Sequence, residues 1–301
     1  MITLTNVSKR FDDVWAVNNV SLTMQEGNVF GLIGTNGAGK TTLLRMVAGI
    51  IKPDGGHIFI DDKPVFNNEN AIQNVYFIPD EPFFFRNANG KDMEKYLNTV
   101  YKGFDTKVFY DYLDKFDLDK NRKISTFSKG MQKQMAIICG LCANTKYLIC
   151  DETFDGLDPV MRNLVKKVIY NDVLERGTTT IITSHSLREL EDTCDQLALL
   201  HKGGIVFESD IQNLKTSLFK VQTAFATPFN RAMFEVVGID ILSYSQMGSV
   251  CTFIVRGDKA TVEEKVRCMN PLLLDILPLN LEEVFVYEME ALGYAFKDVL
   301  M

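Results

Sequence analysis

The sequence lacks any long apolar segment of the kind that crosses a membrane. No stretch approaches about 18 consecutive apolar residues. The start, MITLTNVSKRF, has neither the basic flank nor the long apolar run of a secretory signal. From these two absences we expect the chain to stay in the cytosol.

Basic clusters and a cysteine framework are missing as well. The chain has 32 Lys and Arg against 39 Asp and Glu, a net charge of -7, and no stripe of basic residues. Nucleic acid is therefore not an expected partner. The six cysteines lack the regular spacing of a disulfide scaffold, which is typical of a reducing compartment. Cys139 and Cys142 form a CxxC pair, but they share one apolar helix face, so we favour core packing over metal or redox chemistry.

What is present indicates an α/β protein of two domains. The 301 residues are 46% hydrophobic and 24% charged, ordinary values for a globular chain with room for a large and a small domain. Two alternating strands joined by an Asp-Asp turn fill the first 25 residues. Continuous apolar runs at 28–33, 147–150 and 179–184 predict strands of a buried parallel sheet. We expect a large domain over 1–215, mostly helical at about 86–145, and a small α+β domain over 216–301.

A glycine-rich loop joins the strand at 28–33 to an amphipathic helix. Its sequence fits GxxxxGK[ST], in which glycines let backbone N–H groups surround a phosphate while the helix directs its positive end at the same anion. Lys40 adds a point charge and Thr41 a hydroxyl for Mg²⁺. The alternative interpretation is a glycine-rich turn before a helix that does not bind phosphate. The predicted nucleotide-binding residues here are Gly34, Thr35, Asn36, Gly37, Ala38, Gly39, Lys40, Thr41 and Thr42.

Two acidic residues, Asp151 and Glu152, directly follow the strand at 147–150. They are therefore expected at the sheet edge where ligands bind in open α/β sheets. Asp151 suits Mg²⁺ coordination, and Glu152 suits orienting or deprotonating the water that attacks a phosphate. Without the glycine loop, helix capping would be the better interpretation of such a pair. Together the two motifs indicate phosphoryl chemistry.

Three further segments complete a set that resembles the ABC (ATP-binding cassette) ATPase family. FSKGM (127–131) is similar to the LSGGQ signature, GLD (156–158) to the D-loop, and His185 in ITSHS to the switch histidine. The resemblance covers residues 1 to 215. It implies a P-loop NTPase fold with a RecA-like core, an antiparallel β subdomain and a helical subdomain, with the small α+β domain appended.

The resemblance also implies a site shared between two copies. In the family, Ser128 and Gly130 of one copy close on the γ-phosphate held by Lys40 of the other, which predicts a homodimer, or a heterodimer with a related ATPase, around ATP and Mg²⁺. A helix N-terminus headed by a serine is an anion site on physical grounds too, although Ser128 also suits a plain helix cap. The remaining implied roles are catalysis for Lys40, Glu152 and His185, nucleotide contacts for Phe11 and Asp158, and metal binding for Thr41, Asp80 and Asp151.

Some of these positions leave alternatives or depart from the family pattern. Trp15 is the alternative to Phe11 for stacking on adenine, and either aromatic also suits core packing. Asp80 stands where the family has a glutamine, so it is shorter and adds a negative charge. Phe127 and Lys129 replace Leu and the first Gly of the signature. Ser128 and Gly130 keep its hydroxyl and its second glycine. The aromatic run at 83–85 suits either a groove for a membrane partner or burial in the helical subdomain.

The resulting hypothesis is an ATP-hydrolysing subunit, peripheral on the inner face of the cell membrane, that drives a separately encoded permease. The loop, the signature and the terminal LEEVFVYEM resemble bacterial exporter ATPases of the bacitracin type. A cytosolic ABC ATPase with a regulatory or assembly role is the alternative. The sequence does not identify the cargo, because the membrane subunit normally selects it.

Overall fold

The computed structural model describes residues 1–291 as two compact units, the first Met1–Glu208 and the second beginning at Ser209. The domain boundary predicted after residue 215 falls within helix α8 (Ile211–Ser217), and residues 292–301 of the predicted second domain lie outside the described residues. Within 1–291 no helix has the length and apolarity needed to span a membrane.

The first unit begins with an antiparallel sheet. The two predicted strands are β1 (Ile2–Phe11) and β2 (Val14–Met24), and Asp12 takes a positive φ of 49° in the turn between them. The order of the sheet is β2-β1-β4-β5, with β4 at Gly55–Ile60 and β5 at Lys63–Pro64. Their inward side chains, among them Ile2, Leu4 and Ile60, join a core that also contains Leu43 and Met46 of helix α1 (Lys40–Val47).

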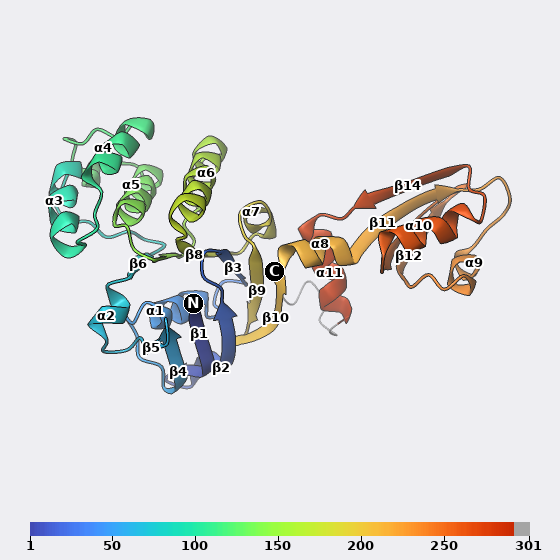
Figure 1. Ribbon diagram of the computed structural model, residues 1–301, viewed down its shortest axis with the longest axis horizontal. Coiled ribbons are helices and arrows are strands. Elements are labelled where there is room, and N and C mark those ends of the chain that lie inside the picture. Colours follow the sequence, from blue (N-terminus) through green and yellow to red (C-terminus); the bar gives the residue numbers. More distant parts are fainter. Residues whose placement is uncertain (292–301) are drawn as a thin grey trace. The chain divides into compact units, whose positions relative to one another are not determined.

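A six-stranded sheet of order β10-β9-β3-β8-β7-β6 forms the centre of this unit (Figure 1). Every residue of the strands Val29–Ile33, Tyr147–Cys150 and Thr179–Ser184 is buried. The first two read as nearly continuous apolar runs, whereas the third, TTIITS, also buries four hydroxyl side chains. β6, β7, β8, β3 and β9 are joined by parallel pairings, so their carboxyl ends meet at one edge. The strands are β3 (Val29–Ile33), β6 (Val75–Ile78), β7 (Tyr147–Cys150), β8 (Thr179–Ser184), β9 (Gln196–His201) and β10 (Gly204–Asp210).

The predicted helical segment contains three α-helices that contact one another, α3 (Gly90–Val100), α4 (Thr106–Lys115) and α5 (Lys129–Cys142) (Figure 1). Each begins at a side-chain cap, and the cap of α3 is a reciprocal Asn89–Asp92 box. Cys139 and Cys142 are both buried on α5, which confirms the packing interpretation, and burial raises the pKa of Cys139 to about 12. The other helices of the unit are α2 (Glu69–Ile72), α6 (Pro159–Arg176) and α7 (Leu187–Glu191), with a 3₁₀ turn at Ile124–Thr126.

The second unit has a βαββαβ arrangement of ferredoxin-like topology. Its antiparallel sheet has the order β12-β13-β11-β14 around a core that includes Val221, Phe234 and Phe253. In the sequence of this unit, LFKVQTAFA and CTFIVRG predict the two inner strands, and TVEEKVRCM and LEEVFVYEMEAL predict the second and the terminal helix; the two edge strands and the first helix are not predicted. The elements are β11 (Leu218–Ala224), α9 (Arg231–Val236), β12 (Ile241–Met247), β13 (Val250–Arg256), α10 (Lys259–Arg267) and β14 (Leu273–Pro278), followed by α11 (Leu281–Ala291).

Candidate active site

The glycine loop follows β3 and leads directly into α1. Gly39 is the residue before the helix and has a φ of 107°, which favours glycine over all other residues. A Cβ at Gly39 would lie 2.1 Å from the carbonyl oxygen of Ala16, and one at Gly34 would lie 2.4 Å from that of Leu200. Glycine is therefore required at both ends of the loop, and the tight curl leaves the loop backbone and the start of α1 facing one pocket.

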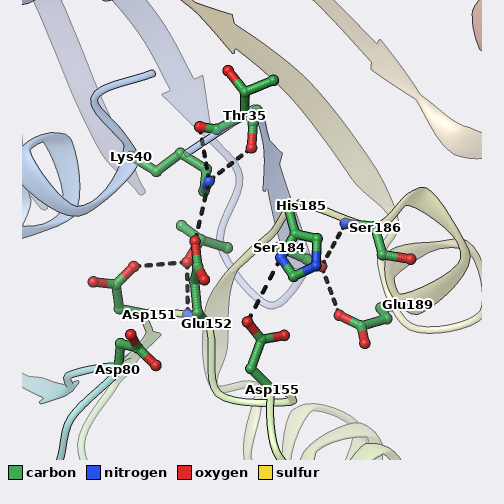
Figure 2. A network of polar contacts seen from close by, with 12 residues as sticks. Thr35, Lys40, Asp80, Asp151, Glu152, Asp155, Ser184, His185, Ser186 and Glu189 are labelled. Atoms are coloured by element: carbon green, nitrogen blue, oxygen red, sulfur yellow. Dashed lines mark hydrogen bonds and ion pairs between the residues drawn. The ribbon is translucent and has the colours of Figure 1, made fainter. Parts of the chain in front are cut away.

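Lys40, the first residue of α1, is almost fully buried in this loop. Its Nζ donates to the carbonyl oxygens of Gly34, at 2.7 Å, and Thr35, at 3.2 Å. Its third partner is Oε1 of Glu152 at 3.1 Å, as Figure 2 shows. The loop thus holds the ammonium in place, and a phosphate oxygen would compete with the Glu152 carboxylate for it.

Asp151 directly follows β7 and is 1% exposed. Its Oδ1 accepts a hydrogen bond from Thr183 Oγ1 of β8 at 2.8 Å. Burial raises the pKa of Asp151, and hydrogen bonds from Thr41 and Thr183 act in the opposite direction. Mg²⁺ prefers oxygen ligands in an octahedral shell that keeps several waters. The Thr41 hydroxyl beside the Asp151 carboxylate fits such an ion, as the sequence predicted for this pair.

Glu152 is in a left-handed backbone conformation, with a φ of 45°, which costs a non-glycine residue about 1–2 kcal/mol. Both of its main-chain polar groups are held. Its N–H donates to Thr183 Oγ1 at 2.8 Å, and its carbonyl accepts from Lys133 Nζ at 2.9 Å and from the N–H of Asp155 at 3.2 Å. In this conformation the carboxylate points to Lys40 at the end of the glycine loop (Figure 2).

His185 follows β8 at the same sheet edge and is half exposed. Its Nδ1 lies 3.6 Å from Oδ2 of Asp155, a residue that the sequence analysis did not single out. Side-chain ligand atoms of Glu152, Asp155 and His185 all lie within 4.8 Å of one another. Burial is the main cause of a raised pKa at Asp155, and its hydrogen bond with Glu152 adds to it. The only sequence signal for Asp155 is its position between Glu152 and Asp158.

A buried network supports the His185 loop. Ser184 Oγ donates to Oε2 of Glu189 at 2.6 Å and accepts from the N–H of Ser186 at 2.9 Å. The other carboxylate oxygen of Glu189 lies 3.1 Å from a guanidinium nitrogen of Arg162 on α6. Ser184, the residue before His185, is therefore connected through Glu189 to the helix that follows Asp158.

The pocket over the loop has a volume of about 350 Å³ and gathers most of the predicted residues. Its lining consists of Ala16, Thr35, Asn36, Gly37, Gly39, Lys40, Thr41, Thr42, Asp80 and Glu152. Gly34 and Ala38 are not in that lining, and Ala38 is buried beneath the loop. The loop therefore presents its central residues and the start of α1 to the pocket.

Asp80 lies in this pocket, but its carboxylate is already paired. Oδ1 of Asp80 is 2.8 Å from Nζ of Lys133 on α5. Lys133 was not predicted as a site residue, and only its place one turn beyond the signature could have indicated it. Metal binding by Asp80 remains a prediction.

The other predicted contacts lie outside the loop pocket. Ser128 caps α5 by accepting from the N–H of Met131 at 3.2 Å, and neither Ser128 nor Gly130 is among the pocket residues. Asp158 caps α6 by accepting from the N–H groups of Val160 and Met161.

The two candidate adenine-stacking aromatics are half exposed, each with a cation over its ring. Lys9 lies 5.5 Å from the ring centroid of Phe11, and Arg10 lies 5.7 Å from that of Trp15. The only β2 residue in the pocket lining is Ala16, which directly follows Trp15. Both aromatics stay candidates for stacking.

Comparisons with known proteins agree with this arrangement. The ABC transporter family model matches residues 17–155. The ABC transporter ATP-binding protein YtrB of Bacillus subtilis (strain 168) is 31% identical over 286 residues, covering 95% of this chain and 97% of YtrB. The bacitracin transport ATP-binding protein BcrA of Bacillus licheniformis is 31% identical over 219 residues, 71% of each chain. Among solved structures, a dimeric ATP-binding cassette in a post-hydrolysis state, bound to ADP and Pi, has a TM-score of 0.63 at 21% identity, covering 70% of this chain and 99% of that one. At 21% identity, the similarity to this solved structure shows a shared fold and nothing more.

Proposed function

The chain belongs to the ATP-binding proteins of ABC transporters and is an ATPase, and from this premise we propose that two copies enclose two ATP molecules and drive a separately encoded membrane permease. The permease is an exporter in this proposal, and the dimer is peripheral on the cytoplasmic face of the membrane. The partner ATPase is a second copy of the chain or a related subunit.

One observation carries the dimer proposal. The chain has two separate anion-binding features, the loop around Lys40 and the N-terminus of α5 at Ser128, and the second does not line the pocket of the first. The N-terminus of a 14-residue helix attracts negative charge through its unpaired N–H groups. A second copy placed head to tail would bring Ser128 and Gly130 to the nucleotide held by the first.

The residues at the sheet edge then take distinct roles. Lys40 and the loop N–H groups bind the phosphates, and Thr41 and Asp151 would hold Mg²⁺, which would supply positive charge against the developing charge on them. Glu152 orients or deprotonates the attacking water. His185, whose ring lies next to the Asp155 carboxylate, contacts the γ-phosphate. Asp158 and Phe11 complete the nucleotide contacts, at the dimer face and at the adenine respectively.

An exposed aromatic cluster supports the permease proposal. Phe83 is 83% exposed, and its ring lies 6.4 Å from that of Phe85. A hollow of about 290 Å³ beside the two rings is also lined by Arg86, Ile124 and Gln132. Large exposed aromatic groups mark interaction sites more often than plain surface. Of the two alternatives for this run, burial or docking, the exposure of Phe83 favours docking.

The relatives support the choice of transport and of direction. One of them is a bacitracin transport protein, and another, 33% identical over 214 residues, is the Nod factor export ATP-binding protein I of Burkholderia lata, covering 69% of this chain and 70% of the relative. The cargo of those proteins is not carried over to this chain.

The test compares the wild-type chain with Glu152→Gln. We expect ATP turnover to fall by roughly 10²- to 10⁴-fold, because the general base is lost while the binding groups stay. With Mg²⁺ and ATP the variant should elute from a sizing column as a dimer, and adding Lys40→Ala should return it to a monomer. Normal turnover by Glu152→Gln would remove the role assigned to Glu152. A monomer in every ATP-loaded form would refute the shared site.

A further inference from the structure

Lys133 joins three parts of the active site that are distant in sequence. It lies on α5, five positions after Ser128, and its side chain is only 12% exposed. Its Nζ lies 2.8 Å from Oδ1 of Asp80 and donates to the carbonyl oxygen of Glu152 at 2.9 Å. Asp80 follows β6 and Glu152 follows β7, so one ammonium links the helical segment to two neighbouring strand ends.

The main chain of Glu152 needs such support. Its φ of 45° is unfavourable for a non-glycine residue and persists only where surrounding contacts enforce it. Thr183 accepts from the Glu152 N–H, and the Glu152 carbonyl accepts from Lys133 Nζ at 2.9 Å and from the N–H of Asp155 at 3.2 Å. Without the bond from Lys133 the Glu152 carbonyl keeps only the longer, neutral bond from the Asp155 N–H at 3.2 Å, so the left-handed backbone and the direction of the carboxylate are held less firmly.

The negative charge around this position explains why the residue that bonds the Glu152 carbonyl is a lysine. Carboxylates of Asp80, Asp151, Glu152 and Asp155 gather at this sheet edge. Lys40 pairs with the side chain of Glu152, whereas Lys133 pairs with Asp80. Asp80 thereby orients the ammonium so that a further N–H reaches the Glu152 carbonyl, and the charge-assisted bonds are stronger than neutral ones.

We propose that Lys133, oriented by Asp80, is a positioning residue for ATP hydrolysis that fixes the Glu152 backbone in its left-handed conformation, an inference that rests on the proposed function. Among the described residues Lys133 does not line the loop pocket, and its bonds go to Asp80 and Glu152 and not to the glycine loop or Lys40. Its removal should therefore slow turnover and leave substrate affinity in place.

The experiment measures steady-state ATPase kinetics of Lys133→Met in the full chain, with Lys95→Met as the matched control. Lys95 is an exposed lysine on α3 of the same helical segment. We expect the kcat of Lys133→Met to fall roughly 10- to 100-fold, the effect of a small displacement of a catalytic group, with KM within about twofold. Lys133→Arg keeps the charge and the donors, so it should restore most of the lost kcat. Thermal unfolding of each variant verifies that it is folded.

Asp80→Ala provides a second route to the same answer, because its side chain is 52% exposed and its loss should not endanger folding. It should lower kcat less than Lys133→Met does, and the double variant should be no slower than Lys133→Met alone. The proposal is overturned if Lys133→Met matches the Lys95→Met control, if Lys133→Arg is as slow as Lys133→Met, or if the two losses multiply. If any of these results is obtained while Glu152→Gln still abolishes the ATP turnover of the wild-type chain, only the role of Lys133 is refuted and the proposed function stands. If the wild-type chain shows no ATP turnover that depends on Glu152, the role of Lys133 and the proposed function are both refuted.

Discussion

Glu152→Gln should bind ATP more tightly than the wild-type chain, apart from its effect on hydrolysis. In the structure the Glu152 carboxylate lies 3.1 Å from Nζ of Lys40, and their side chains are 16% and 4% exposed. An incoming triphosphate must take the ammonium from that carboxylate and then lie next to it. Glutamine keeps the size of the side chain but removes its charge, so Lys40 becomes available at a lower cost.

The expected gain follows from the burial of the pair. At 3.1 Å and an effective dielectric constant of about 20, the gross attraction is about 5 kcal/mol. Desolvation of both ions offsets much of this, and Lys40 keeps its bonds to Gly34 and Thr35. Exposed pairs contribute about 0.2–1 kcal/mol, and breaking buried pairs costs about 3–5 kcal/mol. We therefore expect a gain of about 1–2 kcal/mol, or 5- to 30-fold in Kd.

The assay is equilibrium ATP binding in EDTA, where the absence of free divalent metal prevents hydrolysis from disturbing the measurement. Lys40→Ala should weaken binding, and adding Glu152→Gln to Lys40→Ala should recover little, since no ammonium is left to release. Equal or weaker binding by Glu152→Gln would refute the reasoning. A full gain in the Lys40→Ala background would show that simple removal of a negative charge is responsible, and not competition for Lys40.

Two further predictions concern the glycine loop and the signature helix. Gly39→Ala should lower the free energy of unfolding by more than about 4 kcal/mol, because its Cβ would meet a carbonyl oxygen at 2.1 Å, whereas Gly37→Ala, with nothing within 4 Å, should cost only about 1–2 kcal/mol. Equal urea midpoints for the two variants would contradict this. Ser128→Asp should keep the helix cap, changing unfolding by less than about 0.5 kcal/mol, yet abolish ATP-dependent pairing on a sizing column because its charge repels the partner's phosphate. If Ser128→Asp still forms the ATP-dependent dimer, Ser128 acts only as the cap of α5.

The fold of the first unit was largely predictable because its central strands are buried on both faces. Such strands are rich in apolar and β-branched residues, so β3 and β7 stand out as nearly continuous apolar runs and β8 as a run of Thr and Ile. The edge strands β12 and β14 of the second unit were missed for the converse reason. β12 reads ILSYSQM, with Ser245 and Gln246 exposed, and β14 reads LLDILP, interrupted by Asp275 and with no residue buried. Neither shows a continuous apolar run.

What the sequence determined by itself is the chemistry whose residues are neighbours in the chain. The glycine loop, the acids after β7 and the histidine after β8 each depend on a strand followed at once by particular residue types, so local spacing identifies them. Only the tertiary structure decided which charged groups meet. Lys133 reaches Asp80 across 53 positions, and Lys40 reaches Glu152 across a sheet edge, because parallel strands bring distant segments together at their carboxyl ends. Packing also holds Glu152 in a conformation that its residue type disfavours.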